Sequence, residues 1–225
     1  MLAQLQDGNQ PIQAMGWMSV VQEAASDLLL AVHPPNHVIL WNTATGVKVW
    51  KKQYSETILG FDLDPFDRNK LIFRCQDCFL FVNDFHLTKK PQSEGKKFYV
   101  VGGKGASPIR EDSVGSSNDK GGKGARGTKL RKMMRQVVMG EGRGALNASE
   151  KGELSSCSAV LHHKAQPNIV LAAFPKEVLI LDTEIGQTVG IINLERANSP
   201  LAQLVSCRQS DVLYLLHESG SVSVW

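Results

Sequence analysis

Two of the four cysteines, Cys75 and Cys78, form a C-x-x-C pair. Zinc sites and thioredoxin-type redox centres both use this spacing. A zinc site needs two more ligands, and a redox centre needs its pair at the start of a helix. The pair here lies at a turn between two expected strands, while Cys157 and Cys207 stand singly. We therefore predict structural cysteines and no metal.

The histidines could in principle act as bases or metal ligands. His162 and His163 are adjacent, and His33 and His217 occupy equivalent places in a repeat described below. No Asp or Glu lies at a spacing that forms a catalytic triad or a carboxylate pair with them. The sequence thus predicts neither an enzyme nor a small-molecule substrate.

Two Gly/Lys-rich stretches superficially resemble phosphate-binding loops. They are "GGKG" at 102–105 and "GGKGARGTK" at 121–129. A Walker loop requires G-x-x-x-x-G-K-[ST] between a strand and a helix, and neither stretch has that spacing. Both are interpreted as flexible linker, and no cofactor is predicted.

A repeat organises the rest of the chain. "LLLAVHPPNHVILWNTATGVKV" begins at Leu28, "IVLAAFPKEVLILDTEIGQTV" begins at Ile169, and partial copies begin at Leu71 and Leu213. Each copy has short apolar runs separated by Pro, Gly or Asn turns, which indicates strands rather than helices. A period of about 40–45 residues is typical of β-propeller blades. The structural repeat positions are Trp41, Asn42, Gly46, Val82, Leu181, Asp182, Gly186 and Trp225.

The predicted fold class is all-β, an incomplete WD-repeat propeller of about three and a half blades. Strands are expected near 28–32, 37–42, 71–74, 78–82, 169–173, 177–182, 212–216 and 221–225. The predicted organisation is a remnant of a preceding blade or linker at 1–10, two blades at 11–101, an insertion at 102–150, and one full and one partial blade at 151–225. We expect a fragment of a longer ring, whose open blade faces favour self-association.

The insertion is basic and of low complexity. Residues 86–135 hold thirteen Lys or Arg and four acids, a net charge of +9, whereas the whole chain carries +3. Such a segment buries too little apolar surface to fold alone, so most of 102–150 is expected to be disordered. An anionic membrane surface is one possible partner, and the lack of interleaved aromatic residues makes nucleic acid a poor one. The candidate basic interaction segment comprises Lys120, Lys123, Arg126, Lys129, Arg131, Lys132 and Arg135.

Several stretches carry a more specific resemblance. "PIQAMGW", "DLLLAVHPPNHVILWNTATGVKVWKK", "LDPFD", "GKK" and "PKEVLILDTEIGQTVGIINLER" resemble, in order and spacing, segments of the WD repeat-containing protein 11 family. The resemblance covers nearly the whole chain except its Gly/Lys-rich middle, and places it within the first propeller of that family. The chain departs from the generic WD pattern, because no Gly-His dipeptide precedes a blade and no Trp-Asp dipeptide ends one.

The resemblance implies a non-catalytic scaffold for protein–protein interaction. It implies a subunit of a vesicle-tethering complex at the trans-Golgi network, with tethering-complex subunits and golgins as partners. It also implies links to ciliogenesis and Hedgehog signalling, a cytoplasmic location, and presence in the nucleus and at the ciliary base. The alternative hypothesis is binding of anionic membrane or nucleic acid through the basic insertion.

Overall fold

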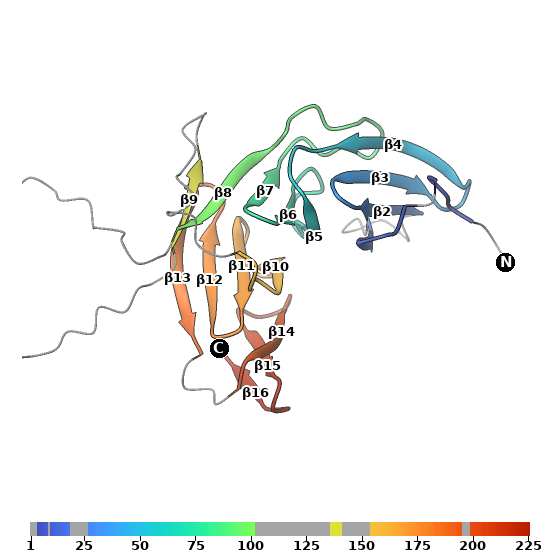
Figure 1. Ribbon diagram of the computed structural model, residues 1–225. Coiled ribbons are helices and arrows are strands. Elements are labelled where there is room, and N and C mark those ends of the chain that lie inside the picture. Colours follow the sequence, from blue (N-terminus) through green and yellow to red (C-terminus); the bar gives the residue numbers. More distant parts are fainter. Residues whose placement is uncertain (1–3, 9, 19–26, 102–135, 141–153, 195–198) are drawn as a thin grey trace, which may run out of the picture.

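The computed structural model describes residues 4–8, 10–18, 27–101, 136–140, 154–194 and 199–225. Within these ranges all the regular elements are β-strands, and they pair only in the antiparallel sense. The sheets follow one another along an arc (Figure 1). The all-β prediction is therefore confirmed.

The first blade is a four-stranded antiparallel sheet in which each strand pairs with the next along the chain. Short apolar runs separated by short turns give this meander, since a short turn can join two neighbouring strands only in the antiparallel sense. Its strands are β1 (Ala14–Trp17), β2 (Leu28–His33), β3 (His37–Asn42) and β4 (Val47–Gln53).

The second and third blades are meanders of the same kind. The second comprises β5 (Ile58–Leu63), β6 (Leu71–Cys75), β7 (Phe79–Val82) and β8 (Lys96–Val101). The third comprises β10 (Ala159–His162), β11 (Ile169–Phe174), β12 (Glu177–Asp182) and β13 (Gln187–Asn193). The fourth sheet has three strands, β14 (Leu201–Ser206), β15 (Leu213–His217) and β16 (Val222–Val224).

An additional strand, β9 (Gln136–Gly140), joins the second and third blades into one nine-stranded sheet. It pairs along its length with β8, where Val101 lies opposite Gln136, and it touches β13 where Val138 lies opposite Gln187. The sequence predicts that the second blade borrows a strand from 129–139. The observed strand begins at Gln136, and residues 129–135 lie outside the described ranges.

Alternate residues of each blade's middle strands pack against opposite neighbours. In β11, Val170 and Ala172 join a core cluster with the second blade, whereas Leu171 and Ala173 join a cluster with the fourth. A third cluster between the first and second blades contains Leu40 and Phe73. The near-continuous apolar runs thus exist because these strands are covered on both faces.

The first blade also has a cluster on the face turned away from the second blade. Ile39 and Trp41 of β3 are buried there, and Leu5 of the N-terminal segment 4–8 packs against them. Asp7 of the same segment forms salt bridges with Lys48 and Lys51 of β4. Side-chain hydrogen bonds from these two lysines lower the pKa of Asp7 from 3.8 to about 2.

The lowered pKa of Asp7 predicts that acid weakens the salt bridges between segment 4–8 and β4. Because the folded-state pKa lies below the ordinary value, the stabilisation by these salt bridges is fully present above about pH 4 and disappears as the pH falls through about 2. We expect Asp7→Asn to lower the denaturation midpoint at pH 7. The difference from the parent chain should shrink between pH 4 and pH 2.5. A difference of constant size, measured by urea denaturation across that range, would contradict the assignment.

Candidate functional site

The predicted repeat positions are spread over the blades, and they do not form one site. Asn42 and Asp182 are each the last residue of a third strand, β3 and β12, and stabilise the turn that follows. The Asn42 side-chain oxygen accepts a hydrogen bond of 3.0 Å from the N–H three residues on. Asp182 accepts bonds of 2.8 and 3.2 Å from the N–H groups two and three residues on. Gly46 and Gly186 complete these turns with φ of 70° and 73°, a region that favours glycine.

The four apolar repeat positions differ in what covers them. Val82 and Leu181 are buried against the preceding blade. Trp41 is also buried, but beneath segment 4–8 and beside the Lys48 ammonium group, which lies 5.7 Å from the ring centroid. Trp225 is 55% exposed, although its backbone pairs with Leu213 as that of Trp41 pairs with Leu29.

The cysteine and histidine side chains that could suggest catalysis or metal binding are mostly buried within the fold. Cys75 and Cys78 are fully buried at the β6–β7 turn, and Cys157 is buried as well. His33 and His217 are buried at the ends of second strands. Among the residues that the structure describes, no three His, Cys, Asp or Glu side chains are arranged to hold a metal ion.

The predicted basic segment from Lys120 to Arg135 lies outside the described residues, so its role stays a prediction. No helix long and apolar enough to cross a membrane occurs in the part of the chain that the structure describes.

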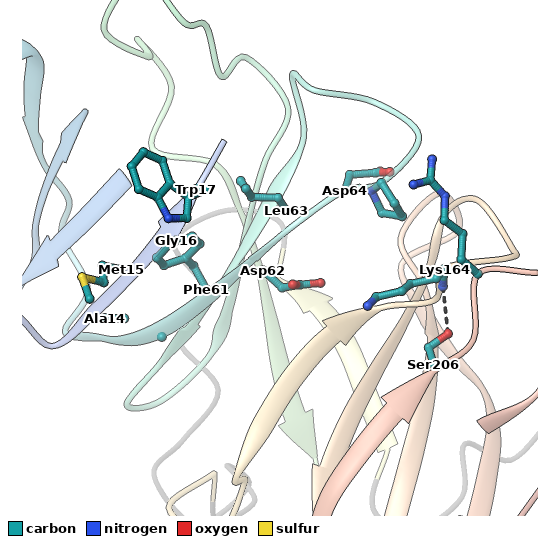
Figure 2. A pocket seen from close by; sticks show the side chains of 13 residues that line it. Ala14, Met15, Gly16, Trp17, Phe61, Asp62, Leu63, Asp64, Lys164 and Ser206 are labelled. Atoms are coloured by element: carbon teal, nitrogen blue, oxygen red, sulfur yellow. Dashed lines mark hydrogen bonds between the residues drawn. The ribbon is translucent and has the colours of Figure 1, made fainter. Parts of the chain in front are cut away.

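A pocket of about 610 Å³ lies on the inner edge of the arc, along the first strands of the blades. Figure 2 shows Trp17 and Phe61 on one side of it and Lys164 and Ser206 on the other. Gly16 provides space where β1 meets β5, because a Cβ there would lie 3.1 Å from the Phe61 ring. The pocket lining is Ala14, Met15, Gly16, Trp17, Gly60, Phe61, Asp62, Leu63, Asp64, Pro65, Lys164, Ser206 and Arg208.

The two acids of the pocket already have partners within the fold. Asp62 accepts a hydrogen bond of 2.6 Å from the His162 backbone N–H, and its carboxylate lies 3.2 Å from the His162 ring nitrogen Nδ1. Asp64 accepts bonds of 2.8 and 3.2 Å from the N–H groups two and three residues on. Asp62 thus connects the second blade to the third, and Asp64 stabilises the loop after β5.

The two cations of the pocket are not engaged in this way. Lys164 follows β10 and Arg208 follows β14, and both side chains are exposed. Among the described residues, no carboxylate forms a salt bridge with either cation. The backbone of Lys164 is nevertheless fixed, since its N–H donates a 2.9 Å hydrogen bond to the Ser206 hydroxyl. The pocket therefore presents two free positive charges from adjacent blades.

Cys207 lies between two pocket residues. The Ser210 hydroxyl and the N–H groups of Gln209 and Ser210 hydrogen-bond its sulfur, and Lys164 is a nearby positive charge. These interactions hold the pKa of the Cys207 thiol below its ordinary value.

Sequence reasoning missed this pocket. Lys164 and Arg208 each follow the first strand of a blade closely, and such strands line the central channel of a propeller. A comparison of those positions across the repeats could have found the two cations. The same comparison would not find the acids, because Asp62 belongs to a strand, "ILGFDL", that is only weakly repeated.

Consecutive antiparallel blades, apolar clusters between them and first strands lining an inner pocket define an incomplete WD-repeat β-propeller. Over 98% of its length, the chain resembles a segment of WD repeat-containing protein 11. Identity is 38% over 221 residues with the zebrafish (Danio rerio) protein and 36% over 226 residues with those of mouse (Mus musculus) and human (Homo sapiens). The resemblance indicated by the sequence is confirmed. The chain spans 17% of the length of these relatives.

Solved structures show the same fold at low sequence identity. The Cps50 (Swd1) β-propeller domain of Myceliophteria thermophila has a TM-score of 0.52 at 13% identity, and the match covers 98% of this chain and 53% of that one. The WD40 domain of Toxoplasma gondii coronin has a TM-score of 0.53 at 13% identity, covering 99% and 44%. No protein-family model matches the chain.

Proposed function

We propose that this chain is part of a non-catalytic scaffold that binds protein partners through the pocket on its inner edge. The observation that supports this is the pair of free cations, Lys164 and Arg208, beside an apolar wall and two acids that are already satisfied. Hydrogen bonds between oppositely charged groups are stronger than neutral ones, and complementary charges across an interface favour the correct partner. The pocket therefore suits an acidic segment of a partner protein. WD40 propellers, whose fold this chain shares, generally mediate protein–protein interactions.

The cellular role that we propose rests on the similarity to WD repeat-containing protein 11. It is a subunit of a vesicle-tethering complex at the trans-Golgi network, acting with other complex subunits and golgins. A cytoplasmic location, presence in the nucleus and at the ciliary base, and links to ciliogenesis and Hedgehog signalling belong to the same proposal.

Charge reversal tests the pocket. The double variant Lys164→Glu with Arg208→Glu should weaken binding of purified tethering-complex subunits at least tenfold, because two attractive contacts become repulsive. The matched control reverses Lys89 and Lys176, which are exposed and lie away from the pocket. Affinities are measured by biolayer interferometry at two salt concentrations. Equal affinities for the double variant and the parent would exclude the pocket as the binding site.

A deletion separates this function from the alternative of membrane or nucleic-acid binding. Val101 and Gln136 lie opposite each other in the β8–β9 ladder, so a two-residue Asn-Gly turn can replace 102–135. Successive strands of a meander alternate in direction, so the fourth strand ends at the rim opposite to the one where the first strand ends. The two cations of the pocket follow first strands, so Val101 at the end of β8 lies at the rim away from the pocket. Partner binding should survive the deletion. If it is lost together with binding to anionic vesicles, the basic insertion is the functional element.

A further inference from the structure

Adjacent residues at the end of β10 contact the blades on both sides. His162, the last residue of β10, bonds to Asp62 of the second blade, as described above. His163 reaches in the other direction, because its ring nitrogen Nε2 lies 3.1 Å from the Oδ1 atom of Asp211 in the loop between β14 and β15. Both histidines are buried, with exposed fractions of 3% and 4%. The third blade is therefore connected to both of its neighbours through one histidine pair.

His163 uses both nitrogens of its ring. Nδ1 accepts hydrogen bonds of 3.2 and 3.0 Å from the N–H groups of Ala165 and Gln166. A ring nitrogen that accepts N–H bonds carries no proton, so we assign the ring proton to Nε2, which donates to the Asp211 carboxylate. The Gln166 side-chain amide donates to the second oxygen of the same carboxylate. Asp211 thus holds the loop after β10 at two points.

Lys164 lies between these two attachment points. Its N–H donates the 2.9 Å hydrogen bond to the Ser206 hydroxyl that Figure 2 shows. Ser206 is buried and ends β14, and Arg208 follows two residues later. The two cations of the pocket therefore extend from backbone segments that are bonded to each other, although they belong to different blades. We call the contacts of residues 163–166 with Ser206 and Asp211 the clasp.

The charge of Asp211 opposes the attraction of the pocket for an acidic partner. A carboxylate that is bonded to the loop of one cation lowers the positive potential that an acidic segment meets there. The Asp211 side chain is 63% exposed, and ionic contacts at the surface add little to the stability of a fold. Its two hydrogen bonds nevertheless attach the loop of one cation to the blade that carries the other. Placing the cations is a role that fits both observations.

We propose that His163, Gln166 and Asp211 are positioning residues, which hold the two cations of the pocket in the arrangement that binds an acidic segment. The inference rests on the proposed function, since it concerns the same pocket. Ordering flexible groups during association costs free energy, and a site that is already ordered avoids part of this cost. The clasp therefore strengthens binding without touching the partner.

Two substitutions at Asp211 remove the same charge and differ in the bonds that they leave. In Asp211→Asn the side-chain oxygen still accepts from His163, and the Gln166 amide can rotate to accept from the new NH2 group. Asp211→Ala removes both bonds. Neither substitution should affect folding, which circular dichroism checks, because this side chain is exposed.

The probe is a fluorescein-labelled hexaglutamate peptide, and its affinity for the whole chain is measured by fluorescence polarisation. Asp211→Asn should bind at least as tightly as the parent chain, because a repelling charge is lost while the clasp is kept. Asp211→Ala should bind about fivefold more weakly than Asp211→Asn, because its cations become ordered only on binding. The double variant Lys164→Glu with Arg208→Glu measures binding outside the pocket, which is subtracted.

Amide hydrogen exchange gives a second readout that needs no partner. Exchange at the Lys164 N–H should be about tenfold faster in Asp211→Ala than in Asp211→Asn, because the bond to Ser206 opens more often. Equal exchange rates, or equal affinities of the two variants, would overturn the inference while leaving the pocket as the binding site. If the double charge-reversal variant binds the peptide as tightly as the parent chain, the proposed function itself is wrong, and the inference with it.

Discussion

Phe73→Ala is expected to lower the free energy of unfolding by about 3–5 kcal/mol. Phe73 lies in the middle of β6, is fully buried, and belongs to the cluster between the first and second blades. Its ring centroid lies 5.1 Å from that of Tyr54 and 6.4 Å from that of Phe61. The substitution therefore leaves a cavity within the cluster that the first and second blades share. Urea denaturation followed by circular dichroism measures the loss.

The matched control for this prediction is Phe66→Ala. Phe66 is 51% exposed in the loop after β5, so the same chemical change should cost well under 1 kcal/mol. Similar destabilisation by both substitutions would mean that the two blades do not share the core cluster assigned to them.

The strands of the repeats could be predicted because their signal is local. Runs such as "LLLAVH" and "IVLAAF" are apolar on both faces, and the structure places them in the middle of blades, where both faces are covered. The turns after β3 and β12 could be predicted for the same reason, since the side chains of Asn42 and Asp182 accept hydrogen bonds from N–H groups only two or three residues on. Expected and observed strands in these parts of the chain agree within one or two residues.

Contacts between blades could not be predicted, because they join residues far apart in the sequence. The hydrogen bond that the His162 N–H donates to Asp62 spans 100 residues, and the one that Arg74 donates to the Cys157 carbonyl spans 83. No periodicity encodes such pairs. The pocket depends on the same long-range placement, since its two cations belong to different blades.

The alignment of the repeats predicts how the backbone of each position pairs, but it does not predict whether the side chain at that position is buried. Trp41 and Trp225 have the same backbone pairing, yet one is buried and the other largely exposed. Burial depends on which neighbour lies over the position, and the repeat pattern within a blade does not contain that information. The division of the chain into 1–10, 11–101, 102–150 and 151–225, and the role of the basic segment, stay predictions.

Gly95→Ala is expected to destabilise the chain by about 2–5 kcal/mol, because left-handed strain and a steric clash add together. Gly95 has φ of +79°, and a Cβ there would lie 2.7 Å from the Phe81 carbonyl oxygen. The preceding loop cannot easily move aside. Asp84 accepts hydrogen bonds from the N–H groups of Gln92 and Ser93, and the buried Lys52 donates to the Pro91 carbonyl. The loss is measured as a shift of the urea denaturation midpoint.

Gly46→Ala separates the two causes. Gly46 has a similar φ of +70°, but nothing lies within 4 Å of the position that its Cβ would take. Alanine at this site meets only the strain of the left-handed conformation, about 1–2 kcal/mol. The difference between the two variants therefore reports the clash with the Phe81 carbonyl alone. Equal destabilisation would show that the loop from Asp84 to Gly95 yields to the added methyl group, and that Lys52 and Asp84 do not hold it against the second blade.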